Sequence, residues 1–177
     1  MMAITVRQET KKDYTEVETV VEEAFKNEEY TDHTEHFLVA KLRKDTAFIP
    51  KLSLAAETDN KIVGHVLLTK IIIENEADHY DSLALAPVSV LPDYQNQGVG
   101  SKLILNALAK ARDLGYKSVI VLGHDKYYSR FGFRPASIFN IESPFKVPDE
   151  TFMALELEED SLNEVSGKAI YSKPFLN

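Results

Sequence analysis

The stretch from Val90 to Leu103, VLPDYQNQGVGSKL, places two glycines where an apolar run ends and a helical pattern begins. Glycine costs a helix about 1 kcal/mol relative to alanine, so Gly98 and Gly100 need a compensating role. A loop between a strand and a helix presents the amides of the helix N-terminus to an anion, and the helix dipole adds about half a positive charge there. The stretch therefore predicts either a phosphate-binding loop or an ordinary turn.

Two common nucleotide-binding loops do not fit the spacing of these glycines. A P-loop requires G-x-x-x-x-G-K-[ST], which the interval from Gly98 to Gly100 excludes. A dinucleotide-binding fingerprint requires glycine or alanine at position 103, where Leu103 stands. What remains is the pattern Gln95-x-x-Gly98-x-Gly100 after a strand that ends at Pro92.

The composition bounds the class of protein. The chain has 177 residues, 44% of them hydrophobic, which suffices for the core of one domain over residues 1–177. The absence of cysteine excludes disulfides, thiolate metal ligands and a cysteine nucleophile. A net charge of -8 argues against general nucleic-acid binding, which needs clustered lysine and arginine. With no signal-peptide pattern and no apolar run near the ~18 residues of a membrane span, we expect a cytoplasmic protein without a membrane partner.

Hydrophobic periodicity predicts an α/β domain built on a mixed sheet. The expected order is strand, two helices, three strands, helix, strand, helix and two strands, over residues 3–8, 14–25, 32–44, 51–57, 61–74, 79–90, 98–114, 117–123, 125–133, 151–157 and 167–175. The strand over 79–90 is apolar on both faces, so we expect it at the centre of the sheet. Pro87 within it predicts a bulge or an unpaired segment. The last two strands are expected to form a terminal hairpin around an acidic turn.

The segment from Val88 to Ile104, VSVLPDYQNQGVGSKLI, resembles the acetyl-CoA-binding motif of the GNAT N-acetyltransferase superfamily. In that family the pattern [QR]-x-x-G-x-[GA] wraps the CoA pyrophosphate. The resemblance implies that phosphates are held, mainly by backbone amides, at Gln95, Asn96, Gln97, Gly98, Val99, Gly100 and Ser101. It also implies that Val88, Ser89 and Val90 hydrogen-bond the pantetheine arm as an added strand would.

A second segment, YYSRFGF from Tyr127 to Phe133, resembles the later F-Y-x-x-x-G-[FY] signature of the same family. Tyr127 takes its first aromatic position and Tyr128 its tyrosine position. The element order is also similar, which implies the GNAT fold with a mixed, mostly antiparallel central sheet flanked by helices. The longer phrases LAPVSVLPDYQNQGVGSKLI and VLGHDKYYSRFGF look like the YhbS-like branch, whose substrates are poorly defined, so the resemblance implies a reaction and not an acceptor.

Acetyl transfer requires a neutral amine, stabilisation of a tetrahedral oxyanion and a proton for the leaving thiolate. Tyr128 is the candidate general acid, because a phenol with a pKa near 10 is protonated at neutral pH. Backbone amides at the end of the Val88–Val90 segment are the candidate donors to the thioester oxygen. His124 is the candidate base or pocket residue, because histidine titrates near pH 6.5. Weaker candidates for the base begin the strand over 79–90: His79, Asp81 and Ser82.

Other titratable residues do not indicate a metal site. His33 and His36 have i, i+3 spacing on an expected helix, but without a third ligand we interpret them as a solvated face, and the reaction requires no metal. His65 is interpreted as a satisfied strand residue. Arg130 and Arg134 could each bind a CoA phosphate or an acidic side chain nearby, and the sequence does not decide between the two.

We therefore predict an N-acetyltransferase that moves an acetyl group from acetyl-CoA to a primary amine of a small molecule or peptide. Direct attack in a ternary complex is expected, because no cysteine can carry the acyl group. Three alternatives stay open: a non-catalytic acyl-CoA sensor on the same fold, an acyltransferase for another acyl-CoA, and a regulatory protein acting through a partner. The acidic stretches KNEEYTDHTEH and ELEEDSLNE are interpreted first as solvated surface, and together they would suit a cationic acceptor. A homodimer is also left open.

Overall fold

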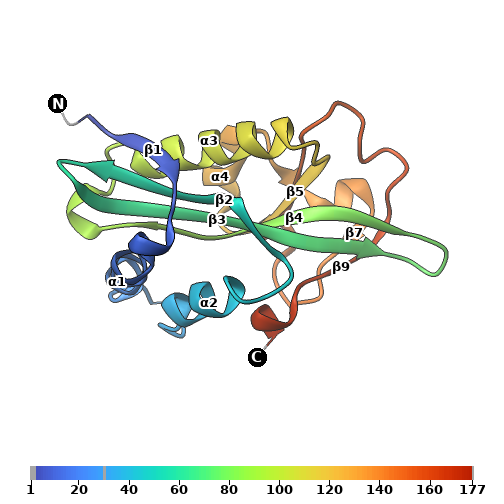
Figure 1. Cartoon of the computed structure of the whole chain (residues 1–177). Coiled ribbons are helices and arrows are strands. Elements are labelled where there is room, and N and C mark those ends of the chain that lie inside the picture. The colour runs from blue at the N-terminus through green and yellow to red at the C-terminus, as the bar shows by residue number, and fades with distance from the viewer. Residues whose placement is uncertain (1–2, 30, 177) are drawn as a thin grey trace. The chain divides into compact units, whose positions relative to one another are not determined.

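The computed structural model describes residues 3–29 and 31–176, whose helices and strands are drawn in Figure 1. The main elements are β1 (Thr5–Gln8), α1 (Tyr14–Phe25), α2 (Glu35–Leu42), β2 (Phe48–Thr58), β3 (Lys61–Glu74), β4 (His79–Val90), α3 (Val99–Asp113), β5 (Ser118–Leu122), α4 (Asp125–Tyr128), β6 (Arg134–Pro135), β7 (Ile141–Glu142), β8 (Phe152–Glu156) and β9 (Gly167–Ile170). The chain divides into two units, Met1–Leu68 with Ala86–Lys110 and Thr69–Leu85 with Ala111–Asn177. The strands β3 and β4 pass through both.

The strands follow the order β1-β2-β3-β4-β5-β8-β6, with β9 paired to β3 and to β7. Pairing is antiparallel for β1 with β2, β3 with β9, and β8 with both β5 and β6. It is parallel for β4 with β5 and for β7 with β9. The predicted fold class, a mixed and mostly antiparallel sheet flanked by helices, is therefore confirmed.

Two strand predictions met different outcomes. The expected terminal hairpin is wrong, because β8 pairs with β5 and β6 while β9 pairs with β3 and β7. The acidic segment between β8 and β9 does not form a tight turn. The Leu162 amide in it donates to the Glu156 carboxylate, and the Asn75 side-chain amide donates to the Ser166 carbonyl. The strand β4 continues through Pro87, which follows a cis peptide bond, but its pairing with β5 covers only Leu83 with Val119 and Ala84 with Ile120.

The second expected helix starts later than predicted. Its first residue is Glu35, after Thr34 at the N-cap, and His33 has a φ of 59°, which lies outside the helical region. His33 and His36 therefore do not share a helix face. The His33 Nδ1 lies 2.9 Å from the Phe25 carbonyl oxygen, and the His36 Nε2 lies 3.3 Å from a Glu22 carboxylate oxygen.

A close contact positions the start of α3 in the first unit. A Cβ at Gly64 on β3 would lie 2.9 Å from Leu103 Cδ1, 3.0 Å from the Ser89 carbonyl oxygen and 3.2 Å from Val99 Cγ1. The first distance is shorter than real Cβ contacts and the other two are tighter than most of them, so any other residue would require its neighbours to shift. The residue at position 64 thus sets how near β3 lies to β4 and to the first turn of α3.

The first unit also buries a polar network around Glu9, the residue after β1. The Glu9 carboxylate accepts hydrogen bonds from Arg43 Nη2 at 2.6 Å and from Ser53 Oγ, and His65 Nε2 lies 3.4 Å away. The side chains of Glu9 and His65 are 1% and 0% exposed. His65 is only partly satisfied, contrary to prediction, because its buried Nδ1 has no hydrogen-bond partner among the described residues. A buried carboxylate requires such pairing, since an unpaired buried charge is strongly destabilising.

In the second unit the core lies around β5, β8 and β9. It consists of buried apolar residues and one tyrosine: Ile71, Ile73, Ala84, Ile120, Ala136, Ile141, Phe152, Ala154, Leu162, Ala169 and Tyr171. Aromatic rings extend it, because Tyr171 packs edge-on against both Phe145 and Phe175 with ring centroids 5.1 and 5.2 Å apart. This packing ties the loop that precedes β8 to the segment that follows β9.

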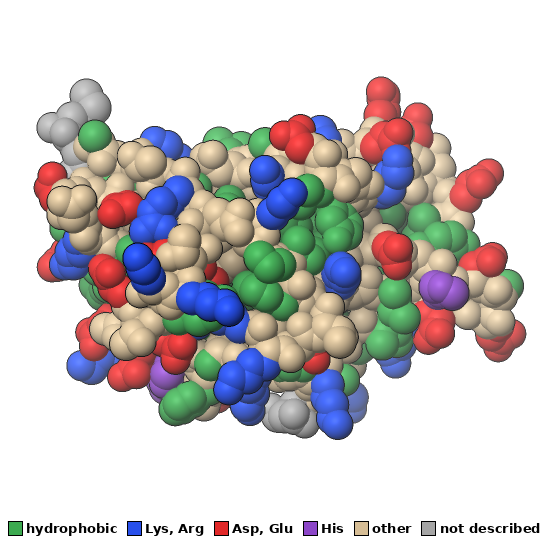
Figure 2. Space-filling view, in the orientation of Figure 1, with side chains coloured by type: hydrophobic (Ala, Val, Ile, Leu, Met, Phe, Trp, Pro, Cys, Tyr) green, Lys and Arg blue, Asp and Glu red, His purple; other side chains and the backbone are tan. Residues whose placement is uncertain are grey.

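Side chains of both charges are mixed on the face shown in Figure 2, with hydrophobic side chains exposed between them. Among the residues that the structure describes, the exposed large hydrophobic ones are Phe37, Leu105, Leu122, Ile138, Ile170 and Leu176. Over the described ranges, no helix combines the length and the apolar character that crossing a membrane would require.

Replacing Arg43 tests the buried network. Arg43→Met should lower the free energy of unfolding by about 3–5 kcal/mol, because it leaves the Glu9 carboxylate buried without its cation. The matched control is Glu18→Gln, which removes the half-exposed partner that Arg43 binds at 2.8 Å and should cost less than about 1 kcal/mol. Urea unfolding of both variants measures the difference, and equal losses would contradict the assignment.

The pH dependence of stability gives a second test of the network. Burial by itself raises the pKa of Glu9, but hydrogen bonds from His65, Arg43 and Ser53 outweigh it and lower that pKa from 4.5 to about 2. The ionised carboxylate therefore stabilises the folded state above pH 4.5, and this contribution is lost as the pH falls from about 4.5 to about 2. The free energy of unfolding of Glu9→Gln should depend less on pH in this window than that of the unmodified protein. Parallel pH profiles would show that Glu9 does not carry the effect.

Candidate active site

The predicted phosphate loop lies between β4 and α3 in the first unit. Asn96 and Gly98 have φ angles of 61° and 84°, in the left-handed region that glycine and, less often, asparagine adopt. The Gln95 side-chain amide donates to the Val90 carbonyl at 3.0 Å, and that of Gln97 donates to the Asp93 carbonyl at 3.1 Å. The two glutamine side chains thus brace the loop, and the Gln95 backbone amide donates to the Pro92 carbonyl at 3.3 Å.

The helix α3 starts directly after Gly98, whose carbonyl accepts the amide of Lys102 at 3.0 Å. Helix geometry gives the amides of Val99 and Gly100, at the first two positions of α3, no acceptor within the helix. Val99 is buried, whereas Gly98 is exposed and Gly100 half-buried. No atom lies within 4 Å of the position that a Cβ at Gly98 would take. The start of α3 therefore combines a positive dipole end with open space beside the loop, which suits a phosphate.

The last residues of β4 lead into this loop. Val88 and Val90 are half-buried, and Ser89 is 1% exposed. The buried Ser89 hydroxyl has no hydrogen-bond partner among the described residues. A buried hydroxyl without a partner costs about 1–3 kcal/mol, so this orphaned group fits a site whose polar ligand completes it.

Tyr128, the predicted acid, ends α4 in the second unit. Its ring lies against the Gly123 backbone, where a Cβ would be 2.4 Å from Cε2. Edge-on contacts hold the ring, with centroids 5.1 Å from Tyr127 and 5.8 Å from Phe133. Burial, with a smaller contribution from Tyr127, raises the pKa of Tyr128 above its usual range, so the phenol is protonated throughout the neutral range. Its hydroxyl has no hydrogen-bond partner within the described part of the chain.

His124 lies at the N-cap of α4, where its carbonyl accepts the amides of Tyr127 and Tyr128, each at 3.1 Å. Its imidazole is exposed and has no hydrogen bond to any described residue. The structure thus brings the backbone of His124 close to Tyr128, while the side chain lies at the surface.

The weaker candidates for the general base, His79, Asp81 and Ser82, lie at the start of β4. His79 and Asp81 are exposed at the start of β4. Ser82 is buried, and its Oγ lies 2.7 Å from that of Ser118, so it links β4 to β5. Ser82 is therefore a structural hydroxyl.

The two arginines left open by the sequence contact aromatic rings. The Arg130 guanidinium lies 5.1 Å from the centroid of the Tyr127 ring, and that of Arg134 lies 5.7 Å from the Phe139 centroid. Residues 3–29 and 31–176 contain no group of three or more potential metal ligands.

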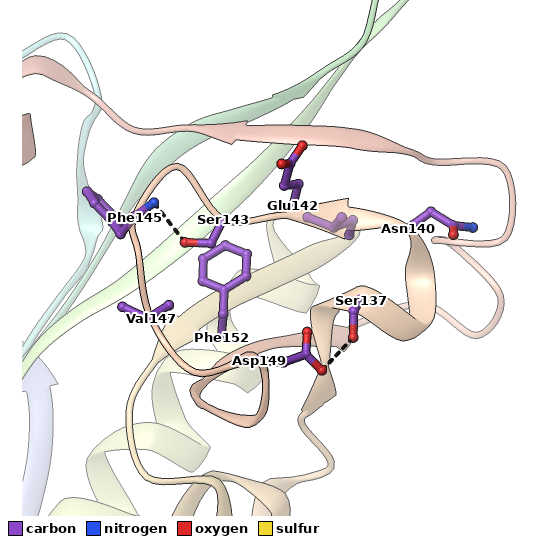
Figure 3. Close-up of a pocket in the computed structure, with 9 residues that line it drawn as sticks. Ser137, Asn140, Glu142, Ser143, Phe145, Val147, Asp149 and Phe152 are labelled. Atoms are coloured by element: carbon purple, nitrogen blue, oxygen red, sulfur yellow. Dashed lines mark hydrogen bonds between the residues drawn. The ribbon is translucent and has the colours of Figure 1, made fainter.

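One feature that the sequence did not reveal is a cavity of about 530 Å³ in the second unit (Figure 3). It is lined by Ser137, Asn140, Ile141, Glu142, Ser143, Phe145, Val147, Asp149 and Phe152. Apart from Phe152, the first residue of β8, these residues belong to the segment between β6 and β8, in which Pro144 and Pro148 interrupt any regular pattern. The only sequence signal was Phe145 and Val147, two apolar residues within an otherwise polar loop.

We compared the chain with known protein families and solved structures. The profile of the acetyltransferase (GNAT) family matches residues 5–133. The solved structure of the GNAT family N-acetyltransferase YhbS from Escherichia coli, in complex with CoA, is 25% identical with a TM-score of 0.89, covering 100% of this chain and 94% of that chain. A GNAT family acetyltransferase from Brucella melitensis, in complex with acetyl-CoA, is 31% identical with a TM-score of 0.81, covering 99% of each chain.

A curated relative agrees with these structures. The uncharacterized N-acetyltransferase YjhQ of Escherichia coli is 41% identical over 114 residues. That match spans 64% of this chain and 63% of the relative, which is less than two thirds of the relative's length. The family profile covers most of the chain and includes both the loop before α3 and the tyrosine at the end of α4. The chain therefore belongs to the GNAT family of acetyltransferases.

Proposed function

We propose that this protein transfers an acetyl group from acetyl-CoA to a primary amine by direct attack in a ternary complex. The observation that carries the proposal is the loop before α3, whose backbone is braced by the Gln95 side chain, whose Gly98 is left-handed, and which has open space beside Gly98 at the start of the helix. The similar structures in complex with CoA and acetyl-CoA support it. The proposal treats residues 1–177 as one acetyltransferase domain, because the two family signatures lie on different units.

The backbone of the first unit would hold the co-substrate. Amides of Gln95–Ser101 would bind the phosphates, and the Val88–Val90 backbone would hydrogen-bond the pantetheine arm, with the unpartnered Ser89 hydroxyl as an added polar group. When bound, acetyl-CoA supplies an activated thioester. Amides at the end of β4 would stabilise the negative charge that develops on the thioester oxygen, since preorganised donors act most strongly where charge appears.

Two side chains of the second unit would move protons. Tyr128 Oη would donate its proton to the departing sulfur, a role compatible with a phenol that is protonated throughout the neutral range. His124 would accept the proton that the attacking amine loses, because its exposed imidazole lies on the residue that caps the helix of Tyr128. The absence of cysteine supports direct attack over a covalent thioester on the protein.

Tyr128→Phe tests the proposed acid. The variant should lose about 100-fold in turnover, because it retains the ring packing against Gly123 and lacks only the proton donor. Release of the CoA thiol from acetyl-CoA, measured with a library of primary amines, reports turnover, and calorimetry reports CoA affinity, which should not change. Tyr127→Phe is the matched control and should stay active. Turnover of Tyr128→Phe equal to that of the unmodified protein would refute the role.

Gly98→Ala tests the loop, with Gly115→Ala as a matched control. Both glycines have positive φ, 84° and 91°, and open space around the added Cβ, so each variant should lose a similar stability, about 1 kcal/mol. Only Gly98→Ala should weaken CoA binding, by about tenfold, because its methyl group would stand between a phosphate and the α3 amides. Calorimetric titration with CoA measures the affinities. An equal effect of both variants on CoA affinity would mean that the loop is only a turn.

A further inference from the structure

Gly123 lies between the end of β5 and the start of α4, where the Tyr128 ring packs against it. A Cβ at position 123 would stand 3.0 Å from Cδ2 and 3.5 Å from Cζ of that ring, and closer still to Cε2. Gly123 does not adopt a positive φ, unlike Gly98 and Gly132. The backbone conformation therefore does not require glycine here, and the closeness of the ring is what excludes a side chain.

The backbone at this contact is tied to the sheet of the second unit. The Gly123 amide donates to the Thr151 carbonyl at 2.9 Å, directly beyond the pairing of Leu122 with Phe152. Phe152 is buried and belongs to the core of this unit. An added methyl group could therefore move the backbone away from the ring only by disrupting the end of the β5–β8 pairing.

The Tyr128 ring is also held by other aromatic side chains. Its centroid lies 5.1 Å from that of Tyr127, 5.8 Å from that of Phe133 and 6.5 Å from that of Phe131. Phe133 is 2% exposed, and a closely packed core gives little room for a ring to move. The Tyr128 amide donates to the His124 carbonyl at 3.1 Å, which keeps the backbone of the tyrosine near the glycine. A ring pushed off Gly123 would have to leave this cluster.

The position of the Tyr128 hydroxyl follows from that of the ring, because a phenol oxygen lies rigidly in the ring plane. Within the described ranges no hydrogen bond holds Oη separately. Proton transfer requires the two heavy atoms to lie about 2.6–3.2 Å apart, and a misplacement of about 1 Å can cost about 100-fold in rate. A small displacement of the ring would therefore be enough to impair an acid at this position.

We propose that Gly123 is a positioning residue: the absence of a side chain at position 123 sets where the Tyr128 hydroxyl lies. A side chain there displaces the ring, and with it the hydroxyl, from the departing sulfur. This inference rests on the proposed function, because a displaced hydroxyl slows the reaction only if it donates the proton. The contact between glycine and ring is independent of that role and can be tested without a substrate.

Gly123→Ala tests the contact by itself. With 3-fluorotyrosine incorporated, the fluorine NMR signal that disappears in Tyr128→Phe reports on the Tyr128 ring. That signal should shift in Gly123→Ala. It should not shift in Gly115→Ala, the matched control, because an added Cβ at Gly115 would meet no atom within 4 Å. An unshifted signal in Gly123→Ala would overturn the proposal.

Turnover tests whether the displaced hydroxyl slows the reaction. Release of the CoA thiol is measured with acetyl-CoA and the primary amine that the unmodified protein acetylates fastest. Gly123→Ala should lower kcat about tenfold and leave the KM for acetyl-CoA unchanged. In the Tyr128→Phe background the same substitution should change kcat less than about twofold, because no hydroxyl is left to misplace. An equal loss in both backgrounds would overturn the proposal, since the alanine would then act by another route.

The two measurements separate this proposal from the proposed function. A shifted fluorine signal with unchanged kcat would support the role of Gly123 in placing the hydroxyl and would refute Tyr128 as the acid. Should circular dichroism show that Gly123→Ala does not fold, the double variant Gly123→Ala, Tyr128→Leu decides. A double variant that folds as well as Tyr128→Leu alone would locate the clash in the ring and support the proposal. One that also fails to fold would show that the alanine disrupts the sheet itself, and would overturn it.

Discussion

The close approach of β3, β4 and α3 at Gly64 is the constraint on which the rest of the first unit depends. The missing side chain lets Leu103 and Val99 of α3, and the Ser89 carbonyl of β4, lie within contact of the β3 backbone. Because helix and strand cannot separate here without opening the core, the first amides of α3 keep a defined direction. The proposed phosphate loop therefore rests on rigid elements on both sides, which is what a preorganised site requires.

The same unit stabilises itself with a buried charge network rather than with apolar packing alone. Arg43 connects the end of α2 to Glu9 after β1, and its guanidinium also stacks 4.0 Å from the centroid of the Tyr14 ring at the start of α1. Such networks hold elements in one register, because a displaced partner leaves a buried charge unpaired. The network lies in the core and belongs to the scaffold that holds the loop.

Local sequence patterns were sufficient for part of the structure and not for the rest. The family, the fold class and the central strand over 79–90 follow from periodicity and two motifs, since these features reside in contiguous residues. The start of α2 was missed because His33 adopts a left-handed conformation, which the pattern over 32–44 does not reveal. The terminal hairpin was wrong because adjacency in sequence suggested pairing of β8 with β9. Ala169 and Tyr171 instead bury in the core beside β3, and long-range packing decided the partner.

The sequence by itself determined the reaction family, through Gln95, Gly98 and Gly100 before a helix and Tyr128 in its aromatic motif. These assignments need only short spacings, because the loop and the small helix are each built from consecutive residues. Tertiary structure alone decided that the buried Ser89 hydroxyl has no hydrogen-bond partner among the described residues, and that residues 137–152 line an open cavity. The burial of Ser89 arises from contacts with residues far apart in the chain, and the cavity arises from how an irregular loop folds over β8, so no local periodicity contains either.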